Sequence, residues 1–194
     1  MKKHAADVWV REGLTVLAEM GPDGLTIDEL CRRLDLSKGS FYHHYANRSM
    51  YIRALLEFWE REMTLRVIEV SQQEGSALQR LRRLTQLSTT FEHERVETII
   101  RAWASQDETV RAYQERVDSR RVQYLSELCA TILDDPDDGL LLARIFYTMY
   151  VGAQHISPPL SGKELQRLYR YFQRHFQRQE KGSVSLGEKP QEPS

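Results

Sequence analysis

Residues 25–53 read LTIDELCRRLDLSKGSFYHHYANRSMYIR, and their spacing predicts two short helices in close succession. The first part of this stretch has the spacing of a capping box. In that motif the side chain of Thr26 accepts a hydrogen bond from the backbone N–H of Glu29, and the Glu29 side chain bonds back to the N–H of Thr26. A helix is therefore expected to begin directly after Thr26, and its apolar spacing ends near Leu34.

A second short helix is predicted over residues 38–45. Ser37 is suited to cap its N-terminus. Asp35 lies between the two helices, where the chain must turn sharply, and we expect a positive φ there because Asp tolerates that conformation better than most residues. Two short helices joined by about three residues cross steeply, as in a helix-turn-helix. Two capped helices of any helical bundle would have the same spacing. The exposed side chains are therefore needed to distinguish a helix-turn-helix from an ordinary helical bundle.

The outer face of the second helix is suited to nucleic acid. No Asp or Glu occurs between Leu36 and Leu56, although the whole chain has a formal net charge of -1. Phe41 and Tyr45 are one turn apart and are expected to face inward. The residues expected to face outward combine charge, hydroxyl groups and aromatic rings: Lys38, Ser40, Tyr42 and His43. Hydroxyls and phenols bind phosphate, and Lys or His reaches purine acceptors in the major groove.

Helical spacing continues through the rest of the chain, and strand patterns are nearly absent. The expected helices are 5–20, 27–34, 38–45, 48–71, 76–93, 96–105, 108–133, 138–156 and 162–178. We predict an all-α fold in which a three-helix helix-turn-helix domain, residues 1–60, precedes a larger helical bundle, residues 61–178, that is used for dimerisation. The tail, residues 179–194, has few apolar residues and is expected to be disordered.

Residues 5–60 resemble the DNA-binding domain of the TetR family of bacterial transcriptional repressors. The segment LSKGSFYHHY, residues 36–45, is similar to the recognition helix of that family nearly residue for residue. The resemblance implies phosphate contacts by Thr26, Ser40, Tyr42 and Arg48, and contacts near the bases by Lys38, Gly39 and His43. Ser37 completes the expected DNA-binding set. Two residues depart from the family pattern, because Asp35 replaces a turn glycine and Arg48 replaces a lysine.

Residues 140–156, LLLARIFYTMYVGAQHI, contain one formally charged side chain, Arg144. A helix that is apolar nearly all round is buried on more than one side. Residues 162–178 add a second apolar stripe: Leu165, Leu168, Tyr169, Phe172 and Phe176. We therefore predict a homodimer that reads a palindromic operator in double-stranded DNA, with half-sites roughly 34–36 Å or a multiple apart. The alternative is a core helix inside one subunit. A membrane span is not expected, because the segment is short and contains polar residues.

The resemblance also implies that residues 61–178 bind a small-molecule effector. Aromatic residues and one histidine are the candidates for lining its pocket: Trp103, Tyr113, Tyr124, Tyr147, Tyr150 and His155. Aromatic residues at helical spacing are more often ordinary core than pocket lining. The interior of a helical bundle favours an apolar or aromatic ligand with few polar anchors. Such a ligand would tilt the helix over 48–71 and change the spacing of the two DNA-binding domains.

The predicted function is thus a dimeric transcriptional repressor that a ligand releases from DNA. No enzyme, cofactor or metal motif is apparent, and Cys31 and Cys129 are expected to be reduced in a cytoplasmic protein without a signal peptide. One alternative is an architectural DNA-binding protein that has the same N-terminal domain and no effector. The other is a helical enzyme that uses the helix-turn-helix only for packing, which requires a cluster of ionisable groups in the second domain.

Overall fold

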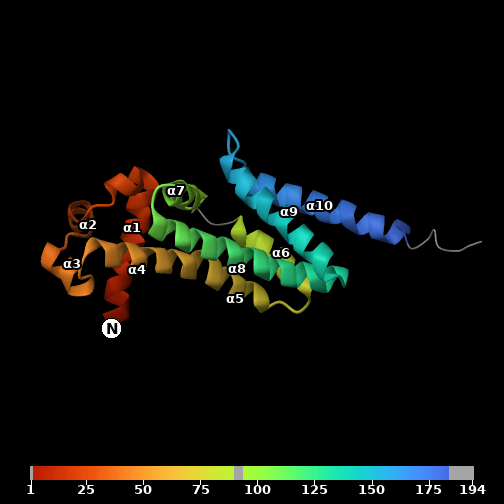
Figure 1. Ribbon diagram of the computed structural model, residues 1–194, viewed down its shortest axis with the longest axis horizontal. Coiled ribbons are helices and arrows are strands. Elements are labelled where there is room, and N and C mark those ends of the chain that lie inside the picture. Colours follow the sequence, from red (N-terminus) through yellow and green to blue (C-terminus); the bar gives the residue numbers. More distant parts are fainter. Residues whose placement is uncertain (1, 90–93, 184–194) are drawn as a thin grey trace, which may run out of the picture.

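The computed structural model describes residues 2–89 and 94–183, and every element assigned in those ranges is helical. The all-α prediction is therefore confirmed for the part of the chain described. The N-terminal helices are α1 (Lys2–Gly24), α2 (Ile27–Leu34), α3 (Lys38–His44) and α4 (Arg48–Glu60). A π-helical turn, η1 (Arg61–Leu65), joins α4 to α5 (Arg66–Gln72). Figure 1 shows α1, α2 and α3 at one end of an elongated molecule.

The remaining helices form the other end of the molecule. They are α6 (Ala77–Ser88), α7 (Glu94–Ala104), α8 (Glu108–Leu133), α9 (Pro136–His155) and α10 (Gly162–Ser183). Helix α10 extends to Ser183, past residue 179, at which the tail was predicted to begin. Residues 184–194 lie outside the described ranges. The helix expected to run to residue 93 ends at Ser88, and residues 90–93 are likewise outside them.

The helix termini around α2 and α3 follow the sequence prediction with one exception. The Thr26 hydroxyl accepts from the Glu29 N–H at 3.2 Å, and the Ser37 hydroxyl accepts from the N–H of residue 40 at 3.2 Å. Asp35 has φ 53°, as expected for the sharp turn. The second half of the capping box is wrong, because the Glu29 carboxylate instead accepts hydrogen bonds from two arginines of its own helix, Arg32 and Arg33.

Aromatic packing fixes α3 on the N-terminal domain. Phe41 is fully buried, and its ring centroid lies 5.4 Å from that of Trp9 and 5.3 Å from that of Tyr51. The Tyr51 hydroxyl donates to the Trp9 carbonyl oxygen at 3.0 Å. Full burial of a large apolar side chain contributes roughly 1.5–3 kcal/mol. The inner face of α3 is therefore held firmly, and its outer face is presented to solvent.

Two hydrophobic cores stabilise the molecule. The first extends from α1–α4 into α7 and the start of α8, where Ile100, Val110 and Val117 are buried. The second lies among α6, α8, α9 and α10. Helices α8 and α9 cross closely, because a Cβ at Gly139 would lie 2.5 Å from the backbone nitrogen of Ala130. No helix in the described ranges is long and apolar enough to cross a lipid bilayer.

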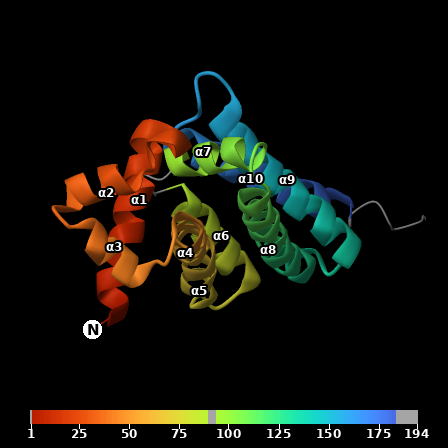
Figure 2. The same cartoon turned by 60° about the vertical axis from the view of Figure 1, so that its left-hand side comes forward.

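Helix α4, η1 and α5 run alongside α8 (Figure 1). The expected helix over 48–71 is thus interrupted by the π turn, which the periodicity of the sequence does not predict. Single π turns within helices often occur at functional sites. Figure 2 shows α4 following α3 and continuing through η1 into α5, so α4 leads from the N-terminal helices into the rest of the molecule.

Candidate nucleic-acid interface

The residues predicted to contact DNA lie together on the surface of α2, α3 and the start of α4. Tyr42 is 53% exposed, and Ser40 is half-buried. The others are exposed: Thr26, Ser37, Lys38, Gly39, His43 and Arg48. This surface therefore combines the N-terminus of α3 with exposed hydroxyls, a phenol and cations. That combination is suited to phosphate oxygens and to the edges of bases.

Lys38 is paired with an acidic residue that the sequence reasoning did not include. Its Nζ lies 2.6 Å from Asp28 Oδ1 of α2, and both side chains are largely exposed. The hydrogen bond to Asp28 is the main cause that raises the pKa of Lys38. An exposed pair of this kind is worth about 0–1 kcal/mol, so a phosphate or a base can replace the carboxylate at little cost.

Arg48 and Gly39 complete the geometry of this surface. The Arg48 guanidinium donates two long hydrogen bonds, each 3.4 Å, to the carbonyl oxygen of Leu25. These bonds tie the start of α4 to the start of α2. A Cβ at Gly39 would have Ser37 Oγ as its nearest neighbour, at 3.6 Å, which is an ordinary contact. Nothing in the folded chain therefore requires glycine at this position.

A cavity of about 80 Å³ lies in the second domain. Its lining residues come from η1, α5, α6, α7, α8, α9 and α10: Met63, Thr64, Val67, Ile68, Leu84, Thr85, Ser88, Glu97, Arg121, Tyr124, Leu125, Phe146, Tyr147, Tyr150 and Tyr169. Most of this wall is apolar. The cavity lies next to the π turn, and it brings together three of the residues proposed as pocket lining, Tyr124, Tyr147 and Tyr150.

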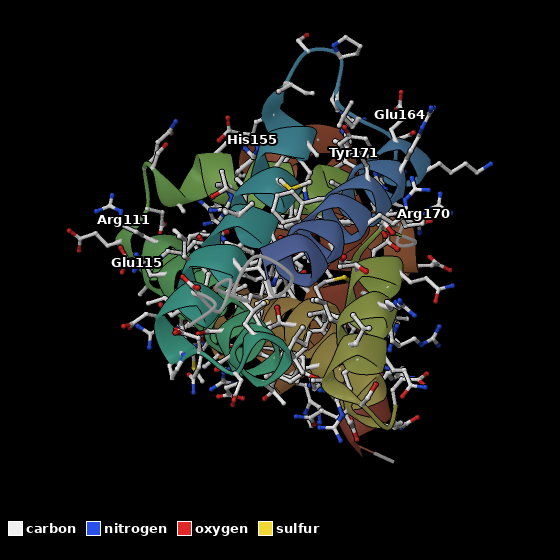
Figure 3. All side chains as sticks on the ribbon, turned by 90° about the vertical axis from the view of Figure 1, so that its right-hand side faces the viewer. Arg111, Glu115, His155, Glu164, Arg170 and Tyr171 are labelled. Carbon is white, nitrogen blue, oxygen red and sulfur yellow. The ribbon has the colours of Figure 1, made fainter. Side chains whose placement is uncertain are left out.

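The other three proposed lining residues lie elsewhere. Trp103 packs against the N-terminal core. The Tyr113 hydroxyl donates to Glu57 of α4 at 3.0 Å, outside the cavity. His155 is exposed at the end of α9, where Figure 3 shows it at the surface. Aromatic residues at helical spacing occur in ordinary cores and on surfaces as well as in pockets, so spacing alone did not separate the two groups.

A buried ion pair forms the polar end of the cavity. The Arg121 guanidinium donates to both carboxylate oxygens of Glu97, each at 2.8 Å, and the two side chains are 11% and 6% exposed. Arg121 also donates to the Thr64 hydroxyl at 2.9 Å and to the Met63 carbonyl oxygen at 3.2 Å. The Trp59 indole N–H donates to Glu97 at 3.1 Å. The pair therefore binds α4 and η1 directly.

The sequence contains a signal for this ion pair. Val117, Arg121, Tyr124 and Leu128 follow helical spacing on α8, so Arg121 occupies a core position within an apolar stripe. Glu97 stands in the same relation to Ile100 on α7. A charged residue at a core position is rarely left unpaired. The partner, however, lies on another helix and is not given by the spacing.

A second polar cluster adjoins the cavity through Tyr147. The Tyr147 hydroxyl donates to Asp118 at 2.6 Å, and Arg101 donates to the same carboxylate at 2.7 and 2.9 Å. Burial raises the pKa of Tyr147 to about 12. Burial by itself raises the pKa of Asp118. The hydrogen bonds from Arg101 and Tyr147 outweigh burial, so the pKa of Asp118 lies below its usual value. Within the described ranges, no group of three or more His, Cys, Asp or Glu side chains is placed to hold a metal ion.

The capped α2–α3 pair and the exposed outer face of α3 define a helix-turn-helix protein of the DNA-binding class. Residues 10–50 match the family described as bacterial regulatory proteins, tetR family. Over 87% of its length the chain also has the fold of a solved regulator of the TetR/AcrR family, with a TM-score of 0.73 at 19% identity. The family match thus covers the helix-turn-helix region, residues 10–50, and the chain shares the fold of TetR/AcrR regulators.

Two solved structures and one curated protein illustrate the similarity. NemR of E. coli, in its reduced form, superposes with a TM-score of 0.73 at 19% identity, over 87% of this chain and 95% of NemR. A TetR/AcrR-type regulator from Aquifex aeolicus superposes with a TM-score of 0.71 at 16% identity, over 89% of this chain and 99% of the other. The transcriptional regulator AcuR of Cereibacter sphaeroides is 32% identical over 81 residues, which are 41% of this chain and 36% of AcuR.

Proposed function

We propose that this chain is a cytoplasmic homodimeric repressor that binds a palindromic DNA operator through α3 and is released from it by a small apolar or aromatic ligand. The observation that carries the proposal is the outer face of α3. There Tyr42 and His43 are exposed while Phe41 of the same helix is fully buried. A helix that is anchored on one side and presents polar groups on the other is the arrangement that reads a major groove.

The proposed roles follow from chemistry and position. Thr26, Ser40, Tyr42 and Arg48 contact phosphate oxygens, and Lys38, Gly39 and His43 approach the bases. Ser37 caps α3 and so directs its free N–H groups toward the DNA backbone. Lys38 exchanges its carboxylate partner Asp28 for a group of the DNA.

The DNA contacts are tested with fragments selected from a random pool by the unmodified chain. Tyr42→Ala and Lys38→Ala are expected to abolish binding to these fragments while thermal unfolding stays unchanged. Tyr42→Phe removes only the hydroxyl and is expected to lose the phosphate contact alone. Lys163→Ala changes an exposed lysine of α10 and is the matched control. Unchanged affinity of both alanine variants at physiological salt would show that the contact surface is misplaced.

Exposed apolar residues on α9 and α10 support the homodimer. Leu141 is 59% exposed and Ile145 is 37% exposed, one turn apart on α9, and Ile156, directly after the helix, is 49% exposed. A Cβ at Gly152, on the same face, would meet no atom within 4 Å. Leu168 of α10 is 43% exposed, and Figure 3 shows α10 running beside α9. An apolar face of this kind marks an interaction surface, and a twofold copy of the same face fits it.

The dimer is tested by placing a charge on this face. Leu141→Glu is expected to convert the dimer to a monomer in sedimentation velocity and to abolish operator binding, because one recognition helix contacts few base pairs. Val8→Glu alters a residue of α1 that is 45% exposed and is expected to leave the dimer intact. A dimer that persists in the Leu141→Glu variant would assign the α9 face to another role.

The cavity supports the ligand response. Its polar end is the Glu97–Arg121 pair, which holds Trp59 of α4 and Thr64 of η1. A ligand that changes the position of this pair therefore acts directly on the helix that reaches the DNA-binding domain. Release of this kind needs the ligand to favour the DNA-free arrangement by about 1–3 kcal/mol, which is about 5–150-fold in affinity. The alternative hypothesis, an architectural DNA-binding protein without an effector, does not predict a cavity at this position.

A further inference from the structure

The charges that line the cavity cancel, and this restricts what the cavity can bind. Glu97 and Arg121 are the charged side chains among its lining residues, and they are paired through two hydrogen bonds of 2.8 Å. Asp118, which lies behind Tyr147, is paired in turn with Arg101. A charged ligand would leave its hydration shell without gaining a free counter-charge, and that transfer costs several kcal/mol.

Most polar groups in the wall already have partners. The Tyr124 hydroxyl lies 2.8 Å from the Ser71 hydroxyl, and the Tyr147 hydroxyl donates to Asp118. An arginine has five N–H groups, and Arg121 uses four of them on Glu97, Thr64 and Met63. One N–H of Arg121 remains for a ligand, and it calls for a hydrogen-bond acceptor.

The rest of the wall and the volume set the size and character of the ligand. Met63, Val67, Ile68, Leu125 and Phe146 supply an apolar surface. A space of about 10–15 Å³ on this measure holds one water molecule. The cavity of about 80 Å³ therefore holds roughly five to eight groups of that size.

We propose that the cavity binds a small uncharged molecule of about eight non-hydrogen atoms or fewer, with an apolar body and one hydroxyl or carbonyl oxygen that accepts a hydrogen bond from Arg121. The inference rests on the proposed ligand response and names the chemical class of its ligand. Arg121 and Glu97 are then the residues that recognise the polar group. Because the same two residues hold Trp59 and Thr64, occupation of this end of the cavity is passed to α4 and η1.

The test uses three molecules of the same number of non-hydrogen atoms and different charge: benzyl alcohol, hexanoate and benzylamine at neutral pH. Benzyl alcohol is expected to raise the Tm of the full chain, by roughly 5–10 °C at a hundredfold excess over its Kd. Hexanoate and benzylamine at the same concentration are expected to leave it unchanged. A shift with either charged molecule that equals or exceeds the shift with benzyl alcohol overturns the proposal, and so does the absence of a shift with benzyl alcohol.

A variant locates the binding. Leu84→Trp fills the cavity and is expected to abolish the shift, whereas Leu65→Trp, at a residue of η1 that is 37% exposed and does not line the cavity, leaves it unchanged. A shift retained in a folded Leu84→Trp chain places the ligand elsewhere and overturns the assignment. If the Leu84→Trp variant does not fold, the comparison of the three molecules still tests the proposal.

These measurements need no DNA, so they fail independently of the proposed function. Binding of selected DNA fragments, measured with and without benzyl alcohol, tests the repressor itself. A chain that binds no DNA but shows the charge-dependent shift refutes the repressor and retains the ligand class. A chain that binds DNA but shows no shift refutes the ligand class alone.

Discussion

Replacement of Gly39 by alanine tests whether glycine is needed at this position for folding or for DNA binding. Gly39 lies in the first turn of α3, and a Cβ there would have its nearest neighbour at 3.6 Å. The folded chain therefore accepts the methyl group. Alanine also costs less conformational entropy than glycine in a helix, which stabilises the chain by roughly 0.5–1 kcal/mol. For a chain of this size that corresponds to an increase in Tm of about 1–4 °C.

The same methyl group is expected to weaken DNA binding. If the α3 backbone at Gly39 approaches the bases, the methyl group displaces the contacts made by the neighbouring Lys38 and Ser40. A good base contact is worth about 1–3 kcal/mol, or about 5–150-fold in affinity, and both half-sites of a dimer lose it. The Gly39→Ala variant is thus expected to be more stable and to bind DNA more weakly. Few substitutions combine these two signs.

Two assays on one preparation decide the outcome. Thermal unfolding gives the change in stability, and fluorescence anisotropy with selected DNA fragments gives the change in affinity. Gly75→Ala, in the turn before α6, is the control and is expected to leave DNA binding unchanged. Undiminished DNA affinity of Gly39→Ala would refute the close approach of α3 to the bases. A lower Tm would show instead that the fold itself requires glycine at this position.

Three further predictions concern the polar contacts. Asp28→Asn removes the partner of Lys38 and is expected to raise DNA affinity by up to about fivefold in the anisotropy assay, since an exposed pair is worth about 0–1 kcal/mol. Hydrogen bonds from two arginines lower the pKa of Glu29 from 4.5 to about 2. The unmodified chain is therefore expected to be more stable than Glu29→Gln at neutral pH, and this difference in stability is lost as the pH falls from 4.5 to about 2. Trp59→Phe removes the indole hydrogen bond to the cavity and is expected to reduce severalfold the effect of benzyl alcohol on DNA affinity, whereas Tyr113→Phe, which removes a bond between α4 and α8 outside the cavity, leaves that effect unchanged.

The local features of the helix-turn-helix could be predicted because they depend on residues close in the sequence. A cap needs a hydroxyl and an N–H three residues away, so Thr26 and Ser37 could be placed without tertiary information. The positive φ of Asp35 follows from the short connection between two helices. The return bond from Glu29 failed because Arg32 and Arg33 compete for the same carboxylate, and a charged partner is the stronger one.

The cavity could be predicted only in part because it is a tertiary feature. Its wall takes residues from helices that are far apart in sequence, and helical spacing does not tell which aromatic residues meet. Tyr147 and Tyr113 have the same chemistry, yet one lies between α8 and α9 beside the cavity and the other contacts α4 at the surface. The π turn at η1 has no signature in the apolar periodicity, because it changes the hydrogen bonding of the backbone and not the residue pattern.

The position of the Glu97–Arg121 pair is better explained by regulation than by stability. A buried ion pair adds little net stability, because the desolvation of both groups offsets their attraction, and apolar residues of similar size often serve as well. This pair is hydrogen-bonded to Trp59, Met63 and Thr64, at the point where α4 passes into the π turn. An apolar substitute would pack against α4 without holding it in one register. Directional bonds hold α4 in a defined position, so under the proposed ligand response a ligand that shifts the ion pair also shifts α4.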